Sequence, residues 1–171
     1  MKPFTEDTAL QWAMRQCSLR ECCRQELSRK MRSGGLAEDA IGRLLLRLQE
    51  ENYLDEQRYA RAFVHDKLAY NGWGRLKIRE ALKAKGVERE DIEQALAEID
   101  GEEYEAILLR LLKAKAAAMP FDATDEQAAF KATSKLLRFA AARGFEYQLA
   151  AKAIRHLPDT TEPEEMPGYM D

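Results

Sequence analysis

The feature that most constrains this chain is a turn built on glycine that recurs three times between stretches of helical periodicity. Gly35, Gly86 and Gly144 each follow one amphipathic stretch and precede another. A shift of 51 residues places Gly35 on Gly86 and superposes the apolar positions that follow, with Ile41 on Ile92, Leu45 on Leu96 and Leu48 on Ile99. A shift of 58 residues extends the pattern to Gly144, with Ile154 on Leu96 and Leu157 on Ile99. A period of about 50 residues is typical of a helical-repeat protein.

Helices are expected on both sides of each turn because apolar residues recur there every three or four positions. In the central copy, Asp55 is a predicted N-cap, and the segment 71–74 breaks the first helix. Two more helices are predicted, over about residues 75–85 and from about Glu88, and Gly86 between them is expected to be a left-handed cap residue. In the first copy, helices are predicted over residues 19–32 and 38–51.

The sequence therefore predicts an all-α protein made of three tandem three-helix repeats that form an elongated, curved array. The repeats are predicted over residues 1–54, 55–100 (the central one) and 101–157. Residues 158–171 hold five acids and no Lys or Arg, and they are expected to form an acidic disordered tail. A second possibility for this tail is that it folds over the basic helix faces and competes with DNA.

Composition and cysteine content indicate a cytoplasmic protein. No apolar run approaches the roughly 18 residues that a membrane span requires, and the N-terminus lacks the basic start and apolar core of a secretory signal. The odd, clustered set Cys17, Cys22 and Cys23 makes a poor disulfide framework. These thiols could bind a metal, but zinc sites use four ligands, so a small core residue is the favoured interpretation of Cys23. No membrane association is expected.

Basic residues repeat at helical spacing and form the candidate binding site. The chain carries a net charge of −3, yet residues 1–157 hold 27 basic and 25 acidic residues, a charge of +2. In the central repeat, Arg75, Arg79 and Lys83 share one helical face. A shift of 55 places Arg20 and Arg24 on Arg75 and Arg79, and Lys30 on Lys85; the third repeat has Lys131, Lys135 and Arg138 nearby instead. Such rows suit phosphates or an acidic protein surface, although any single residue of them is equally well an ordinary solvated side chain.

Trp73 lies between two glycines, ahead of this basic row, and completes the candidate site. It could present its ring to a base or a partner, but a core tryptophan that closes the repeat is the favoured interpretation. The predicted binding residues, for nucleic acid or an acidic protein surface, are Arg20, Arg24, Lys30, Trp73, Arg75, Lys77, Arg79, Lys83 and Lys85. Neither histidine lies in a catalytic or metal motif, and no phosphate loop or nucleophile elbow is present. The sequence supports no enzyme function, cofactor or metal.

Three segments of the central repeat form a recognisable set: YLDEQRYARAF at residues 53–63, GWGR at 72–75 and IREALKAKGV at 78–87. With these segments the chain resembles the RecX regulators of the bacterial RecA recombinase. The resemblance covers about residues 8–157. It implies a non-enzymatic, monomeric negative modulator that binds in the groove of the RecA filament on single-stranded DNA. It also implies inhibition of recombination, strand exchange and ATPase activity, and hence a role in regulating DNA repair and the SOS response.

Two other functions are compatible with the residues alone. A stand-alone DNA-binding protein would place a helix of the central repeat in a groove and would bind duplex tightly with a steep salt dependence. A helical-repeat adaptor for an unrelated partner would show neither DNA binding nor an effect on RecA. One ATPase titration of a RecA filament, with a DNA-only mobility shift beside it, separates the three.

Overall fold

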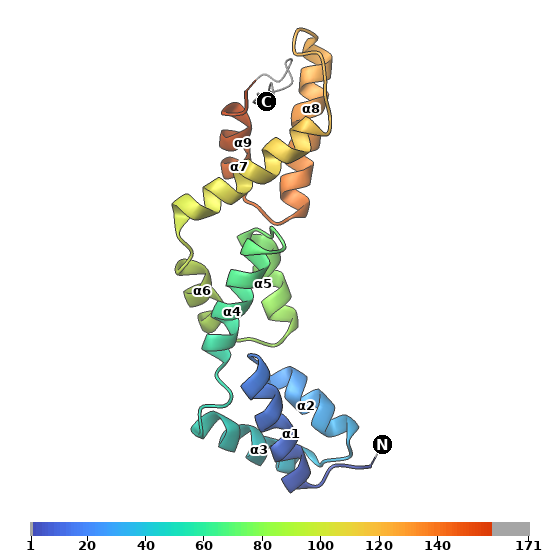
Figure 1. Ribbon diagram of the computed structural model, residues 1–171, viewed down its shortest axis with the longest axis vertical. Coiled ribbons are helices and arrows are strands. Elements are labelled where there is room, and N and C mark those ends of the chain that lie inside the picture. The colour runs from blue at the N-terminus through green and yellow to red at the C-terminus, as the bar shows by residue number, and fades with distance from the viewer. Residues whose placement is uncertain (1, 159–171) are drawn as a thin grey trace, which may run out of the picture. The chain divides into compact units, whose positions relative to one another are not determined.

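The computed structural model describes residues 2–158, and over that range the chain is all-helical (Figure 1). This part of the chain contains nine helices and no strand, which confirms the predicted fold class. The helices are α1 (Glu6–Leu19), α2 (Arg24–Ser33), α3 (Glu38–Glu50), α4 (Glu56–Ala69), α5 (Arg75–Ala84), α6 (Arg89–Ala97), α7 (Gly101–Ala117), α8 (Glu126–Ala142) and α9 (Tyr147–Arg155). The predicted acidic tail lies outside the described residues from position 159 onward.

The chain forms two compact units that are interleaved in sequence. The first unit comprises Met1–Lys67 and Ile78–Ile99, and the second comprises Leu68–Lys77 and Asp100–Asp171. Each unit therefore draws on two separate stretches of chain. Two of the three boundaries fall inside α4 and α5, and the third falls between α6 and α7. The division into three repeats stays a prediction, as does their arrangement in an elongated, curved array.

The predicted helix signals of the central repeat are confirmed. The Asp55 carboxylate accepts hydrogen bonds from the backbone N–H groups of Gln57 and Arg58, both at 3.0 Å, as an N-cap does. At the end of α5, Gly86 has a φ of +75°, in the left-handed region that glycine adopts without steric cost. The corresponding Gly35 and Gly144 have φ values of +95° and +89°. The repeated glycines thus end helices in the same way at all three positions.

The prediction of one helix over residues 19–32 is wrong at its start. Helix α1 ends at Leu19, Arg20 is extended with φ −157° and ψ 163°, and α2 begins only at Arg24. The side chains of Cys22 and Cys23 in the break are 1% and 0% exposed, so burial of this segment competes with helix continuation. Arg20 and Arg24 are consequently not neighbours on one helical face.

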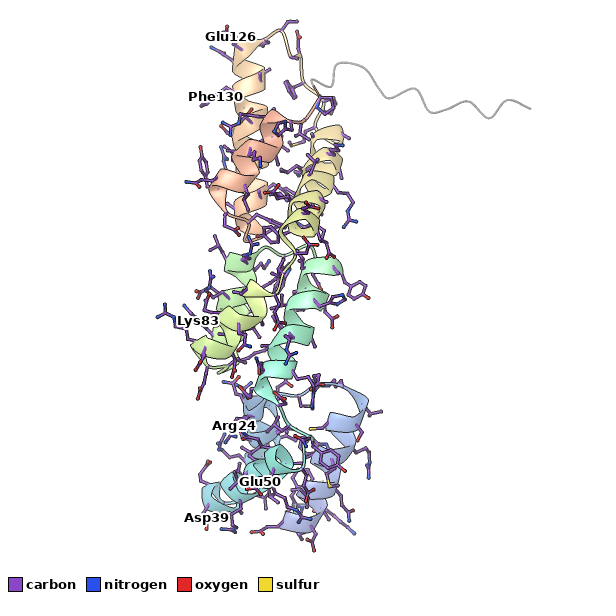
Figure 2. All side chains as sticks on the ribbon, turned by 90° about the vertical axis from the view of Figure 1, so that its left-hand side faces the viewer. Arg24, Asp39, Glu50, Lys83, Glu126 and Phe130 are labelled. Atoms are coloured by element: carbon purple, nitrogen blue, oxygen red, sulfur yellow. The ribbon has the colours of Figure 1, made fainter. Side chains whose placement is uncertain are left out.

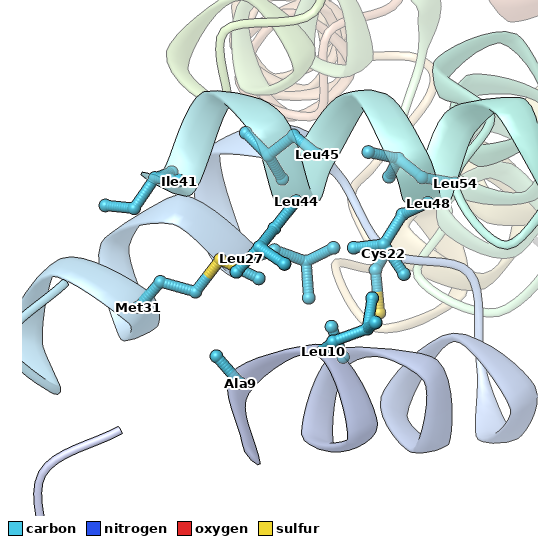
Figure 3. Packing of buried hydrophobic residues seen from close by; sticks show 11 residues of the cluster. Ala9, Leu10, Cys22, Leu27, Met31, Ile41, Leu44, Leu45, Leu48 and Leu54 are labelled. Carbon is cyan, nitrogen blue, oxygen red and sulfur yellow. The ribbon is translucent and has the colours of Figure 1, made fainter. Parts of the chain in front are cut away.

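One hydrophobic cluster of the first unit is built from leucine-rich faces of its N-terminal helices (Figure 3). Leu27 and Met31 of α2 pack with Ile41, Leu44 and Leu48 of α3, and α1 and the α1–α2 break complete the cluster. The remaining members of this cluster are Ala9, Leu10, Ala13, Cys22, Leu45 and Leu54. Cys23 is fully buried as well, which agrees with its interpretation as a small core residue.

Two glycine turns of the second unit pack backbone to backbone. The Gly74 N–H donates to the Arg143 carbonyl at 2.7 Å, and the Leu76 N–H donates to the Gly144 carbonyl at 2.9 Å. A Cβ atom on Gly74 would lie 2.4 Å from the Gly144 oxygen, and one on Gly144 would lie 2.4 Å from the Lys77 backbone nitrogen. Only glycine permits this approach, and the bond to Leu76 satisfies an amide in the first turn of α5 that has no partner within the helix.

The described residues include no helix long and apolar enough to cross a membrane. They also include no group of three or more His, Cys, Asp or Glu side chains arranged to hold a metal ion. Cys17, Cys22 and Cys23 are free thiols. Burial raises the pKa of Cys17 to about 12, with Cys22 adding to the effect.

Candidate functional site

Two of the predicted cations, Arg20 and Lys85, meet at one carboxylate in the first unit. Glu26 on α2 lies between them, with Arg20 Nη1 at 3.2 Å and Lys85 Nζ at 3.3 Å. Partial burial alone would raise the pKa of Glu26, but the hydrogen bonds from these two cations outweigh it and lower the pKa. The repeat alignment assigned Arg20 and Lys85 to different copies, but the fold brings them together. Glu26 neutralises part of their positive charge.

Arg24 lies in acidic surroundings at the start of α2. Its backbone N–H donates to Glu56 Oε1 at 2.7 Å, and its guanidinium donates to Gln49 Oε1 at 3.0 Å. These residues line a polar cleft of about 750 Å³ whose other walls include Asp55, Glu88 and Asp91. The carboxylates of this cleft repel phosphate, so the surroundings of Arg24 favour a cationic partner over nucleic acid.

The cations on the first-unit part of α5 are paired with carboxylates as well. Arg79 contacts Glu93 through two hydrogen bonds, from Nε at 2.6 Å and from Nη2 at 3.2 Å. Those bonds lower the pKa of Glu93. Lys83 is 3.4 Å from Glu80 on the same helix, and both side chains are mainly exposed. Exposed ion pairs add little stability, so the contact with Glu80 leaves Lys83 available to a partner. Arg79 is instead held in place by its two hydrogen bonds to Glu93.

Arg75 belongs to a structural network of the second unit. Its Nη1 donates to Glu146 at 2.7 Å, and its guanidinium lies over the Tyr104 ring, 3.9 Å from the centroid. The Tyr104 hydroxyl donates to Glu146 at 2.6 Å and accepts from the Arg75 N–H at 3.0 Å. Burial, reinforced by the hydrogen bond to Glu146, raises the pKa of Tyr104. This arrangement ties α5 to α7 and to the start of α9.

Trp73, which lies in the turn before α5, contacts Lys77 on the second-unit part of that helix. Lys77 Nζ lies 4.5 Å from the centre of the Trp73 ring, a cation–π distance. Trp73 is half-buried, and Lys77 is exposed. Lys30 on α2 is half-buried and forms no ion pair within residues 2–158. Whether any of the nine predicted residues touches DNA or a recombinase stays a prediction.

The sequence interpretation gave little weight to one basic surface, the outer face of α8. Phe130 on this helix is 74% exposed, and Lys131, Lys135 and Arg138 are exposed beside it. Residues 127–143 contain four basic residues and no acid, and they belong to the longest stretch without Asp or Glu in residues 1–157. This acid-free run is a signal in the sequence itself, but it does not coincide with the positions equivalent to Arg75 and Arg79 in the repeat alignment.

The fold and these faces define an all-α protein that carries its charged residues on the outer sides of several short helices. A family model described as the second three-helix domain of RecX matches residues 55–96. The regulatory protein RecX of Pseudomonas savastanoi pv. phaseolicola is 36% identical over 143 residues, which are 83% of this chain and 86% of that protein. The regulatory protein RecX of Clostridium perfringens is 31% identical over 133 residues, 78% of this chain and 60% of that longer protein.

Solved structures agree at the level of the fold. The crystal structure of RecX from Lactobacillus salivarius superposes with a TM-score of 0.77 at 20% identity, over 88% of this chain and 94% of that one. A second crystal structure, of regulatory protein RecX, gives a TM-score of 0.74 at 18% identity, over 88% of this chain and 73% of that one. The chain belongs to the RecX family of regulatory proteins.

Proposed function

We propose that this chain is a negative modulator of the RecA recombinase. It binds along the groove of the RecA filament on single-stranded DNA and inhibits strand exchange, recombination and ATPase activity, and so regulates DNA repair. Membership of a family of regulatory proteins carries the proposal, because the likeness extends over 83% of the chain. The protein acts without catalysis or cofactor, as a monomer, in the cytoplasm.

The proposed mechanism is steric and electrostatic. A string of small helical units that spans neighbouring recombinase subunits opposes filament growth, and exposed cations hold it against phosphates or acidic groove residues. Within the first unit, Lys30 and Lys83 suit that contact best because neither is held by a strong internal ion pair. Arg75 and Arg79 contribute mainly by keeping α5 in place.

The test is a titration of the protein into a RecA–single-stranded DNA ATPase reaction, with a DNA-only mobility shift in parallel. We expect ATP hydrolysis to fall as the protein is added, at concentrations where the DNA-only sample shows weak or no shift. Tight, salt-sensitive duplex binding with no effect on ATP hydrolysis would instead indicate a stand-alone DNA-binding protein. No effect in either assay would refute both functions.

A charge-reversal pair tests the mechanism. Lys30→Glu with Lys83→Glu is expected to weaken inhibition, because it replaces two exposed or half-buried cations with anions. The matched control is Arg43→Glu with Arg47→Glu, which makes the same change of charge on α3, where both cations are already paired with acids. Equal loss of inhibition in the two variants would show that net charge alone, not these positions, governs binding.

A further inference from the structure

The outer face of α8 combines an exposed aromatic ring with cations at helical spacing. At 100° per residue, Phe130, Arg138, Lys131 and Lys135 fall within an arc of about 140°, opposite the buried Leu136. Figure 2 marks Phe130 along the first half of this helix, one turn beyond Glu126. The ring is 74% exposed in a unit that buries other aromatic rings of its own, Tyr104 and Phe145. Phe130 is therefore not needed for the core.

The positive charge on this face is not neutralised by carboxylates of residues 2–158. Among residues 2–158, no carboxylate lies within ion-pairing distance of Lys131, Lys135 or Arg138, whereas Arg20, Arg75, Arg79 and Lys85 are each paired. Positive charge also adjoins the helix. Lys115 of α7 and Arg143 lie 5.6 Å and 5.0 Å from the Phe139 ring. A phosphate at this face displaces no internal partner.

An exposed phenylalanine beside unpaired cations has the properties that single-stranded nucleic acid requires. Unstacked bases pack on aromatic rings, and phosphates of the same strand contact neighbouring Lys and Arg. A duplex offers the phosphates but keeps its bases stacked, so Phe130 adds nothing to duplex binding. An acidic protein surface would use the cations, but it would engage Phe130 only through an apolar pocket in that surface, whereas every base offers a flat face for stacking.

We propose that the α8 face, defined by Phe130, Lys131, Lys135 and Arg138, binds single-stranded DNA directly, with a base stacked on Phe130. This deepens the proposed function and rests on it for its biological setting, since it names the surface that holds the strand in the filament. Binding to DNA is measured without recombinase, so failure here and failure of RecA inhibition are distinguishable.

The first experiment measures the binding of fluorescein-labelled oligothymidylate by anisotropy at low salt. Phe130→Ala is expected to weaken binding about 5- to 150-fold, the range for one base–aromatic stack. Tyr147→Ala is the matched control, because Tyr147 is a 70% exposed aromatic residue of the same unit and lies outside the α8 face. Circular dichroism should show both variants folded. Equal affinities for the two variants would overturn the stacking assignment.

The second experiment separates stacking from charge by salt dependence. Lys131→Gln with Lys135→Gln should reduce the slope of log K against log salt by about 1.4, at roughly 0.7 per phosphate contact on a single strand, whereas Phe130→Ala should leave the slope unchanged. Arg43→Gln with Arg47→Gln removes the same charge from α3 and should leave the slope near that of the unmodified protein. A slope that falls equally in both lysine and arginine pairs would overturn the proposal.

Two further outcomes decide between ligands. Stronger binding of oligothymidylate than of duplex, with the preference abolished by Phe130→Ala, supports the proposal. Loss of RecA inhibition in the α8 variants without any DNA binding by the unmodified protein would show that the face contacts protein, and would also overturn it.

Discussion

Replacing Arg75 with alanine should destabilise the second unit, because the side chain holds Glu146 and Tyr104 together. The Arg75 and Glu146 side chains are 26% and 30% exposed, and their hydrogen bond is 2.7 Å long. A hydrogen bond to a charged partner contributes about 1.5–3 kcal/mol, and the cation–π contact with Tyr104 adds about 0.5–1 kcal/mol. We therefore expect Arg75→Ala to lower the free energy of unfolding by about 2–4 kcal/mol.

The chain offers a reporter for this unit alone. Its two tryptophans are Trp12 in the first unit and Trp73 in the second. In a Trp12→Phe background, urea unfolding followed by fluorescence therefore reports the second unit. Arg110→Ala is the matched control, because Arg110 is an exposed cation on α7 with no ion pair within residues 2–158. If Arg75→Ala lowers the free energy of unfolding no more than Arg110→Ala does, the network of Arg75, Tyr104 and Glu146 does not stabilise the unit and the reasoning fails.

Two further predictions concern glycine and an ion pair. Gly144→Ala should destabilise the protein by about 2–4 kcal/mol, since it combines a left-handed φ with a Cβ 2.4 Å from Lys77; Gly42→Ala, in an open position within α3, should stabilise it by about 0.5–1 kcal/mol. Equal effects of the two substitutions in thermal unfolding would contradict the packing described. The lowered pKa of Glu26 means that its stabilisation is present above its ordinary value of 4.5 and is lost as the pH falls through the lower folded value. The stability difference between the unmodified protein and Glu26→Gln should thus shrink in urea titrations as the pH is taken from 7 toward 3; a constant difference would show that Glu26 does not titrate as expected.

Local signals were sufficient to predict most helices of the central repeat. The signals are the N-cap Asp55, the left-handed Gly86 and the apolar spacing around Ile78. Each determines structure only within a few residues along the chain, so it can be recognised from the sequence alone. The break at Arg20–Cys23 had no such signal, because it contains neither glycine nor proline and is set by the burial of two cysteines. Helical periodicity alone therefore predicts a continuous helix there, which the structure does not have.

The basic rows were harder to interpret because charge partners come from distant parts of the chain. Arg75 pairs with Glu146, which is 71 residues away, and Lys85 pairs with Glu26, which is 59 residues away. Periodicity shows which cations share a helical face but not which carboxylates fold against them. The α8 face differs because a whole segment lacks acids, a property that the sequence displays without any knowledge of tertiary contacts.

The interleaved composition of the two units has a consequence for synthesis and for truncation. Residues 78–99 complete the first unit, but they are made after the segment 68–77, which belongs to the second. During translation, the Leu76 amide in the opening turn of α5 therefore reaches its acceptor within the protein only after Gly144 has emerged. No single cleavage of the chain releases both units whole, and an N-terminal fragment that ends anywhere from residue 68 to residue 98 lacks part of each.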